Sequence, residues 1–510
     1  MTDGLILALD QGTTSTRAIA YDTAGAAVAQ ASRPLAQSYP ADGWVEHDAE
    51  TIFADAVAVM REAIAASGRP TSSHPASAVA ALGIANQRET VVVWERASGR
   101  PIHPAVVWQD RRTAPTCERL REAGCEAQVA ATTGLLLDPY FSAAKIAWVL
   151  DRVEGARAAA ERGTLLAGTI DTWLVWKLTG GRVHATDPTN ASRTSLMDLR
   201  RQSWDDGMLR LFDVPAALLP EIRDTAGDFG ETQAGLLGAA VPIRALVGDQ
   251  QAALFGHGGA EPGALKATYG TGAFMLLHTG ETAPRSSARL LSTAAARIGG
   301  QPAFALEGSM FSAGPALPWA GDLLGGVGWD GLESLAARVS ADHRVLLVPA
   351  FTGLGAPWWD PRARGAVLGL TRDAGAPELA AAAYDSVALQ TRDLVDAMRA
   401  DAPEAFGGGA FGEEGAGPAL RIDGGMARSR LFPQRLADLT GLEVHVAADP
   451  EITARGAARL AAIGAGLALP DPADAAPQRF APSVDAAARD AAHARWRAAV
   501  AAVRGFAAHA

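Results

Sequence analysis

Two adjacent charged residues, Arg88 and Glu89, follow an apolar run in the segment GIANQRETVVVW. A guanidinium group donates several hydrogen bonds and a carboxylate accepts them, so the pair suits two neighbouring hydroxyl groups. An ion pair at the surface or between domains explains the same two residues more simply. The pair therefore indicates a polyol site only if other groups gather beside it.

Two aromatic residues are candidates for such groups. Trp108 lies at the expected end of a strand in AVVWQDRR, and Tyr140 lies in a loop in LLLDPYFSAAK. An aromatic ring can cover the C–H face of a polyol, and a tyrosine hydroxyl can hydrogen-bond to it. Each aromatic residue taken alone is more typical of a protein core.

A carboxylate with a candidate catalytic role follows the apolar run of ALVGDQQAALFG. Asp249 and Gln250 stand there at the expected start of a helix. A carboxylate in this position can cap the helix, and it can also accept the proton of a hydroxyl that attacks a phosphorus atom. The two roles are compatible, so Asp249 is a candidate general base.

Small hydroxylated residues separate two apolar runs near the start of the chain, in LALDQGTTSTRAIAYD. The runs 5–9 and 18–21 predict an antiparallel hairpin, and we expect Gly12 to permit the backbone angles of its turn. Consecutive N–H groups in such a turn can form an anion-binding nest, with Asp10 beside it. The combination suits phosphate and a divalent metal, although ordinary hairpins have similar turns.

Helix-like and strand-like segments alternate around these residues. Apolar residues at helical spacing predict a helix between a cap at Asp48 and a stop at Gly68. The segments SAVAALGIANQRET and PAVVWQDRRT each end an apolar run with polar groups, and LLAGTIDTWLVWKLTGG runs from a strand into a helix. This alternation predicts an α/β architecture, in which ligands bind beyond the carboxyl ends of strands.

The second half of the chain repeats the pattern of the opening segment. GALKATYGTGAFMLLHTG, at 263–280, again shows a strand, a glycine-containing turn and a second strand. LRIDGGMARSR, at 420–430, runs from a strand through a Gly-Gly turn into a helix, a further candidate cradle for a nucleotide. We expect two domains that grip a nucleotide from both sides, with their boundary near 254–261.

Composition limits the classes of function. A chain of 510 residues is longer than one hydrophobic core usually supports, and its net charge of −11 argues against a nucleic-acid surface. Cys117 and Cys125 lack the spacing of a metal site, which predicts free thiols in a reducing compartment. There is no basic leader and no long apolar run, so we expect a cytoplasmic protein without membrane insertion.

Two further segments are expected to be structural. The glycine-rich segment 402–419 is typical of a flexible surface loop. The alanine-rich end of the chain from Val484 predicts a closing helix with Trp496 as its anchor.

The motifs resemble the FGGY family of carbohydrate kinases, and within it the members that phosphorylate glycerol. The resemblance covers nearly the whole chain, through LALDQGTTSTRA, YPADGWVEHDAE, GIANQRET, VVWQDRRTA, GDQQAALFG, YGTGAFML and VPAFTGLGAPWWDPRARGAVLGLTR. It implies an α/β fold of two actin-like, ribonuclease-H-type domains that face each other across a catalytic cleft. Residues 1–254 would form the N-terminal domain, with the polyol and first phosphate sites, and 255–510 the C-terminal domain, with the nucleotide site.

The resemblance also implies an activity and a set of site residues. The activity is the ATP-dependent, magnesium-requiring conversion of glycerol to glycerol 3-phosphate, in glycerol uptake and catabolism, with Asp249 as catalytic base. The implied polyol-binding residues are Arg88, Glu89, Trp108, Tyr140, Asp249, Gln250 and Phe274. The implied ATP-binding residues are Thr13, Thr14, Ser15, Arg17, Thr271, Gly314, Gly425 and Ser429, with Asp10 near Mg²⁺. A homodimer or a homotetramer is compatible with the resemblance.

Two positions depart from the family pattern. Pro318 stands where a glutamine that contacts the nucleotide is usual, and Ser429 stands where an asparagine is usual. All residues implied to bind the polyol match the family pattern, whereas two of those expected near the adenosine differ from it.

Two alternatives remain. A kinase for another small polyol or a ketose is the nearest, but a longer substrate would need a smaller residue at Trp108, Tyr140 or Phe274. An actin-like ATPase or a sugar-responsive binding module without catalysis is the alternative from another class. Such a protein would keep the phosphate turns and would not need a polyol site with a catalytic base.

Overall fold

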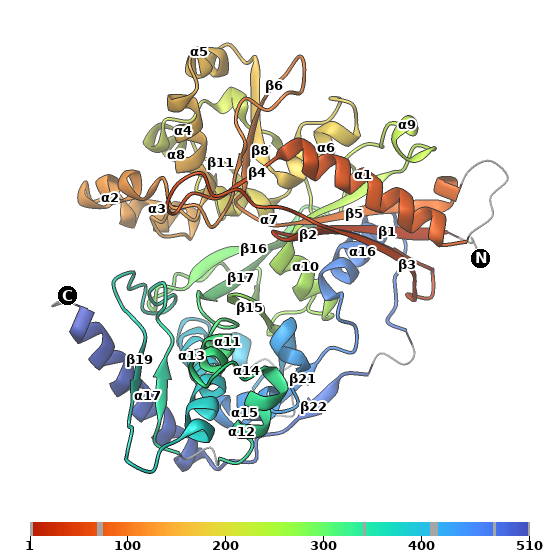
Figure 1. Cartoon of the computed structure of the whole chain (residues 1–510). Coiled ribbons are helices and arrows are strands. Elements are labelled where there is room, and N and C mark those ends of the chain that lie inside the picture. Colours follow the sequence, from red (N-terminus) through yellow and green to blue (C-terminus); the bar gives the residue numbers. More distant parts are fainter. Residues whose placement is uncertain (1–3, 69–74, 340–342, 408–416, 473–475, 508–510) are drawn as a thin grey trace.

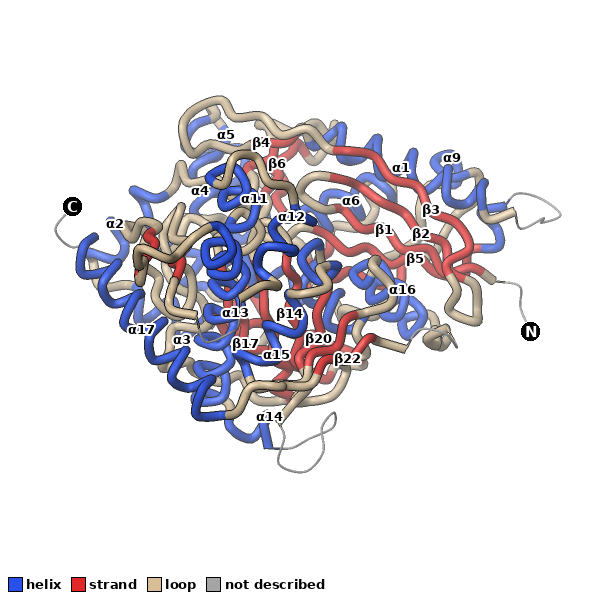
Figure 2. Tube along the Cα trace, turned by 60° about the horizontal axis from the view of Figure 1, so that its bottom comes forward, coloured by secondary structure: helices blue, strands red, loops and turns tan. Residues whose placement is uncertain are grey.

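The computed structural model describes residues 4–68, 75–339, 343–407, 417–472 and 476–507. Its N-terminal half, red to yellow in Figure 1, lies above its C-terminal half, which runs from green to blue. Each half contains a large sheet with helices packed on its faces (Figure 2). The α/β architecture expected from the sequence is confirmed.

The large sheet of the first half has five strands in the order β13-β5-β1-β2-β3. These strands are β1 (Leu5–Gln11), β2 (Ser15–Tyr21), β3 (Ala27–Pro34), β5 (Val79–Asn86) and β13 (Ile243–Gly248). β1, β2 and β3 are antiparallel neighbours, whereas β5 runs parallel to β1 and β13 parallel to β5. The predicted opening hairpin is confirmed as β1 and β2.

The large sheet of the second half has seven strands in the order β16-β17-β15-β14-β20-β21-β22. They are β14 (Leu265–Tyr269), β15 (Ala273–Gly280), β16 (Leu291–Ile298), β17 (Gln301–Met310), β20 (Leu420–Asp423), β21 (Val444–Val446) and β22 (Gln478–Phe480). β14, β15 and β17 are antiparallel in turn, and β20 and β21 continue parallel to β14. Five strands therefore repeat the order and direction of the first sheet, which confirms the repeat predicted from the sequence.

Helices and short strands complete both halves. The helices up to residue 237 are α1 (Ala49–Ala66), α2 (Ala114–Glu122), α3 (Glu126–Thr133), α4 (Ser142–Arg152), α5 (Ala156–Glu161), α6 (Ile170–Leu178), α7 (Pro188–Ala191), α8 (Asp206–Phe212) and α9 (Ala234–Leu237). The later helices are α10 (Asp249–Gly256), α11 (Ala316–Leu323), α12 (Trp329–Ala336), α13 (Ala376–Asp401), α14 (Pro403–Gly407), α15 (Phe432–Thr440), α16 (Ile452–Gly464) and α17 (Ala486–Ala507). The short strands are β4 (Glu46–His47), β6 (Val91–Glu95), β7 (Ala105–Val106), β8 (Leu165–Thr169), β9 (Ala185–Thr186), β10 (Met197–Asp198), β11 (Ser203–Trp204), β12 (Glu221–Ile222), β18 (Leu346–Val348) and β19 (Ala366–Leu368).

The first strand shows how the sequence determines the two faces of a sheet. Leu5, Leu7 and Leu9 point to one face and pack with apolar residues of α1. Ile6 and Ala8 point to the other face and pack with apolar residues of α16. Because successive strand residues alternate between faces, an uninterrupted apolar run produces a strand that is covered on both sides.

Two predicted helices are confirmed together with their local signals. α1 begins directly after Asp48, whose side chain accepts a hydrogen bond from the backbone N of Glu50 at 3.0 Å. α17 carries the fully buried Trp496, whose indole Nε1 donates to Oδ2 of Asp393 at 2.7 Å. The prediction that Trp496 anchors the C-terminal helix is therefore confirmed.

Two expectations need correction. The φ angle of Gly12 is not in the left-handed region. Its N–H instead donates to the backbone O of Ser15 at 2.9 Å, and a Cβ at Gly12 would lie 3.3 Å from that oxygen. Glycine is therefore suited to position 12 because a side chain would crowd the backbone oxygen of Ser15, and not because of its φ angle. In the segment expected to be a loop, 403–407 form α14, and 408–416 lie outside the described residues.

A close helix crossing links the halves. α16 belongs to the second half by sequence, yet it packs on β1, β5 and β13 of the first sheet and against α10. A Cβ on Gly456 of α16 would lie 1.7 Å from the backbone O of Ala252 in α10, and one on Gly256 would lie 2.1 Å from that of Ile452. Glycine at both positions lets the two backbones touch. The predicted division into 1–254 and 255–510 falls within α10 and stays a prediction.

Both cysteines, Cys117 and Cys125, are free thiols. Across the described part of the chain, no helix combines the length and hydropathy that crossing a membrane requires.

The helix crossing leads to a stability prediction. Gly456→Ala should destabilise the protein by roughly 1–3 kcal/mol, because an added methyl group forces α10 and α16 apart. The midpoint of urea unfolding, followed by circular dichroism, measures this change. Gly505→Ala is the matched control: it is a helical glycine with nothing within 4 Å of an added Cβ. At position 505, alanine should stabilise the protein by about 0.5–1 kcal/mol. If both variants changed the free energy of unfolding equally, the close packing of α10 against α16 would be contradicted.

Candidate active site

A buried ion pair joins the two halves of the molecule. Arg88, just beyond β5, places Nη1 2.5 Å from Oε2 and Nη2 3.1 Å from Oε1 of Glu307 in β17. The side chains are only 2% and 0% exposed, so water does not separate the charges. Burial acts to lower the pKa of Arg88, but the negative charges of Glu307, Glu89 and Asp249 together outweigh it and hold that pKa well above its usual value. The two-pronged geometry is the strongest form of such a pair.

A second buried pair extends this cluster within the first half. Oε1 of Glu89 accepts a hydrogen bond from Nε of Arg193 at 2.5 Å, and Nη2 of Arg193 lies 3.1 Å from Glu307. Burial raises the pKa of Glu89, and the charge of Arg193 opposes that rise. Glu89 has a φ of 62°, a strained conformation that is concentrated at functional sites. The guanidinium of Arg193 also lies 5.3 Å from the ring centre of Tyr140.

Three predicted aromatic residues meet beside the cluster. The ring of Trp108 lies edge to face against Tyr140, with centroids 5.6 Å apart, and against Phe274, with centroids 6.1 Å apart. They come from separate elements: Trp108 follows β7, Tyr140 precedes α4, and Phe274 lies in β15 of the second half. Nε1 of Trp108 donates to Oγ1 of Thr13 at 2.8 Å. The indole thus connects the aromatic wall to the opening turn.

The candidate base contacts Arg88 and Gln250 directly and is linked through Gln250 to Lys266 of β14. Asp249 is the first residue of α10, and its Oδ1 lies 3.3 Å from Nε of Arg88. Gln250 donates its backbone N to Oδ1 at 2.7 Å and its Nε2 to Oδ2 at 3.2 Å. Oε1 of Gln250 in turn accepts from Nζ of Lys266 at 2.5 Å. The side chain of Asp249 is 31% exposed, so its carboxylate is oriented and still accessible.

Lys266 of β14 is buried in this network. Burial lowers its pKa to about 8. Its Nζ also donates to Oγ1 of Thr268 at 3.1 Å, and Thr268 donates to Asp423 at the end of β20. Lys266 therefore connects the helix of the candidate base to the second sheet.

Asp10 is the last but one residue of β1 and lies close to the candidate base. Burial, followed by the charge of Asp249, raises the pKa of Asp10 to about 7. A divalent cation would relieve both effects. Over the described residues, no group of three or more His, Cys, Asp or Glu side chains could hold a metal ion. Mg²⁺ does not need such a group, because it usually binds one or two carboxylates together with substrate phosphates and waters. Asp10 fits that mode of binding.

The opening turn exposes part of its hydroxylated sequence. Thr13 is partly exposed and Thr14 exposed between β1 and β2, and Ser15, the first residue of β2, is partly exposed. The hydroxyl of Thr13 accepts the hydrogen bond of Trp108 and keeps its own proton to donate. Arg17 forms an ion pair with Glu451, directly before α16. The turn offers donors to an anion, whereas Arg17 already has a partner.

Two turns of the second half contain glycines, and the space available for a side chain differs between these positions. A Cβ on Gly314 would lie 2.4 Å from the backbone O of Gly270, beside the exposed Thr271, so glycine is needed there. At the other turn, Gly424 has a φ of 92° and a Cβ on it would lie 2.4 Å from the backbone O of Tyr269. Gly425, the predicted adenosine position, has open space around it.

Ser429 is engaged by the protein itself. Its Oγ donates to Oε2 of Glu333 at 3.0 Å and accepts from the backbone N of Leu431 and of Phe432, at 3.1 and 3.0 Å. The side chain therefore holds the start of α15. Pro318, the other departure from the family pattern, is exposed in α11.

Sequence reasoning missed three charged residues of the site. Glu307 and Lys266 are single charges within the apolar runs FALEGSM and GALKATYG, and Arg193 lies in the polar segment TNASRTS. A lone charge in a buried strand is a usable signal, because charged side chains are rarely buried without a partner. The identity of that partner could not be read from the sequence.

Comparison with known proteins identifies the chain. Residues 5–256 and 265–465 match the N-terminal and C-terminal domains of the FGGY family of carbohydrate kinases. The chain is 51% identical over 505 residues to a glycerol kinase of Methylobacterium nodulans, covering 97% of each protein. It is 50% identical to a glycerol kinase of Ectopseudomonas mendocina, covering 98% of this chain and 99% of that protein.

Solved structures agree with this match. The structure of Plasmodium falciparum glycerol kinase with ADP is 31% identical and superposes with a TM-score of 0.89 over 98% of each chain. That of xylulose kinase from Rhodospirillum rubrum is 25% identical, with a TM-score of 0.84 over 99% of each chain. The expected fold of two actin-like domains is confirmed. The chain belongs to the FGGY family of carbohydrate kinases.

Proposed function

We propose that this protein transfers the γ-phosphoryl group of ATP to a terminal hydroxyl of glycerol, giving glycerol 3-phosphate and ADP. The observation that carries the proposal is the accessible carboxylate of Asp249, 3.3 Å from the buried guanidinium of Arg88, in a charged cluster whose Arg193 lies over the ring of Tyr140. Relatives at about half identity, named glycerol kinases, support glycerol as substrate. The ADP in the Plasmodium falciparum structure supports an adenine nucleotide.

In this proposal, the charged residues bind the hydroxyls of glycerol and the aromatic residues contact its carbon chain. Arg88 donates to one hydroxyl of glycerol and Glu89 accepts from a neighbouring one, while Trp108, Tyr140 and Phe274 cover the carbon chain. Gln250 keeps the carboxylate of the base in position. These contacts place a terminal hydroxyl at Asp249.

The chemical step is an in-line phosphoryl transfer. The glycerol oxygen forms a bond to the γ-phosphorus, the bond from that phosphorus to the β,γ-bridging oxygen breaks, and Asp249 takes the hydroxyl proton. ADP leaves with the electron pair of the broken bond. Asp10 would hold Mg²⁺, which would supply positive charge beside the phosphate oxygens.

The nucleotide is held by two turns and a glycine cradle in this proposal. The turn with Thr13, Thr14 and Ser15 donates to phosphate oxygens, as does the turn with Thr271 and Gly314. Gly425 leaves open backbone for adenosine. Arg17 binds phosphate by exchanging Glu451 for a phosphate oxygen, and Ser429 acts through the start of α15.

A substrate panel tests the proposal directly. A coupled assay with Mg-ATP over glycerol, dihydroxyacetone, erythritol and xylulose should give the highest kcat/KM with glycerol. The aromatic wall leaves no small residue at which a longer chain could enter. A preference for xylulose or erythritol would overturn the substrate assignment and favour a kinase for another polyol or ketose.

We further propose that the enzyme works in the cytoplasm, because ATP and free thiols such as Cys117 and Cys125 belong to that compartment. A homodimer or homotetramer stays a prediction.

Removal of the base tests its chemical role. Asp249→Asn keeps the size of the side chain but cannot accept the proton, so kcat should fall by roughly 10²–10⁴-fold. Isothermal titration should show that glycerol and the nucleotide still bind. Asp206→Asn is the matched control, since Asp206 is likewise the first residue of a helix, α8. Near-normal turnover in Asp249→Asn would mean that this carboxylate only caps α10.

The buried cluster generates a second prediction. Glu307→Gln leaves Arg88 and Arg193 without their shared counter-charge, so Arg88 should shift and the KM for glycerol should rise at least about tenfold. The KM for ATP should change much less, and the midpoint of urea unfolding should fall. Glu221→Gln is the control, because Glu221 forms an exposed ion pair with Arg223. Parallel changes in both KM values would show that Glu307 does not act through the polyol site.

A further inference from the structure

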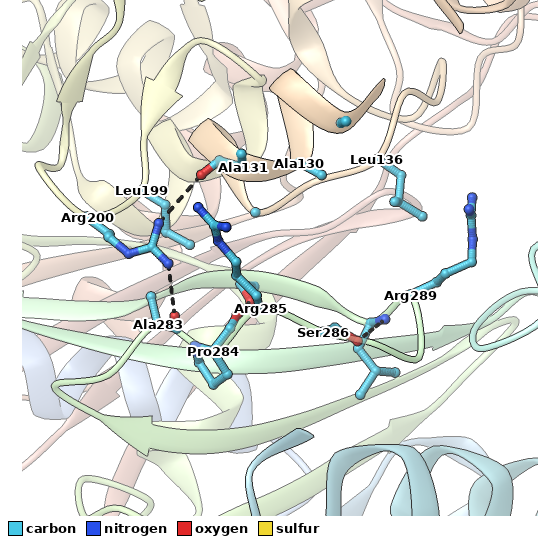
Figure 3. A pocket seen from close by; sticks show the side chains of 14 residues that line it. Ala130, Ala131, Leu136, Leu199, Arg200, Ala283, Pro284, Arg285, Ser286 and Arg289 are labelled. Atoms are coloured by element: carbon cyan, nitrogen blue, oxygen red, sulfur yellow. Dashed lines mark hydrogen bonds between the residues drawn. The ribbon is translucent and has the colours of Figure 1, made fainter. Parts of the chain in front are cut away.

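A separate cavity lies between the two halves, outside the residues described above. Its volume is about 230 Å³, and Leu136, Leu199 and Arg200 of the first half face the segment 283–292 of the second. Figure 3 shows Arg200, Arg285 and Arg289 around it. The cavity shares no residue with the proposed polyol or nucleotide sites.

The charge around this cavity is unbalanced. The guanidinium of Arg200 donates only to backbone oxygens, of Ala131 at 3.5 Å and of Ala283 at 3.4 Å. Arg289 reaches one carboxylate, that of Glu126, at 3.4 Å. The Arg285 side chain has no hydrogen-bond or ion-pair partner within the described ranges. Three arginines thus line a small cavity, and within the described ranges only Arg289 among them pairs with a carboxylate, in a chain whose net charge is −11.

The segment that carries two of these arginines is held firmly. The Asp401 carboxylate accepts from the backbone N of Ser287 at 2.8 Å and from its Oγ at 2.7 Å. Arg289 has a φ of 59°, and its carbonyl accepts from Nε1 of Trp359 at 2.8 Å. These bonds hold the backbone of the segment that carries Arg285 and Arg289, and both arginines line the cavity without a bound ligand.

We propose that this cavity binds a small phosphate monoester. Guanidinium groups bind phosphate oxygens through paired N–H donors, which suits three arginines that lack strong partners. The volume corresponds to about eight water molecules at ~30 Å³ each. That space accommodates a phosphate group and a body of three or four carbons, which Leu136 and Leu199 would contact.

The position of the cavity gives the ligand a mechanical role. A molecule that touches Arg200 on one side and Arg285 on the other stabilises the present arrangement of the two halves. Leu136 of the cavity lining also packs on the apolar cluster that contains Tyr140 and that Trp108 and Phe274 contact, so one cavity residue adjoins the aromatic wall. The binding of the monoester does not depend on the proposed reaction.

Isothermal titration with 3-phosphoglycerate tests the proposal. The whole protein is first saturated with glycerol and a non-hydrolysable ATP analogue, so that the proposed active site is filled. One molecule should then bind per chain with a Kd of about 1 mM or less. Binding should raise the thermal midpoint in proportion to the logarithm of ligand concentration.

Variants of exposed residues locate the site. Arg285→Gln should weaken binding about tenfold, and Arg200→Gln with Arg285→Gln should abolish both the heat signal and the thermal shift. Arg495→Gln with Arg497→Gln, two exposed arginines on α17, should leave both unchanged. Undiminished binding in the Arg200/Arg285 variant would overturn the proposal. So would an absence of binding to the parent protein, or inorganic phosphate that binds as tightly as 3-phosphoglycerate.

Discussion

The ion pair between Arg88 and Glu307 is the interaction on which the geometry of the site depends. Two charges taken out of water are costly unless they meet at short distance and with good alignment. Arg88 follows a strand of the first sheet and Glu307 lies in a strand of the second, so the pair positions one sheet against the other. Its bidentate geometry leaves Nε of Arg88 free to face Asp249.

Further contacts involve the charged cluster that contains Arg88 and Glu307. Arg193 bridges Glu89 and Glu307, and it places a positive charge over the ring of Tyr140. Gln251 of α10 lies 3.3 Å from Nη1 of Arg88 and donates to the second sheet at Ala294. These contacts fix the polyol-binding residues and α10, which carries Asp249, relative to both halves of the molecule.

The duplicated sheets explain where the phosphate turns lie. β1 and β14 occupy equivalent central positions, each followed by an antiparallel strand and flanked by a parallel one. The turns at 12–14 and 270–272 therefore leave the carboxyl ends of equivalent strands, where open α/β sheets bind ligands. α16 breaks the simple division of the chain, because it returns to the first sheet and makes the close crossing with α10.

The sequence by itself determined the features that depend on neighbours along the chain. The cap at Asp48, the two hairpins and the anchor at Trp496 follow from local periodicity, and the motifs with Arg88 and Asp249 identified the family. Tertiary structure decided the partners: Arg88 meets Glu307 across 219 residues, and Glu89 meets Arg193 across 104. It also decided the role of Gly12. Burial of a charge depends on a partner that another strand or turn supplies, and no local window of sequence specifies which one becomes its neighbour.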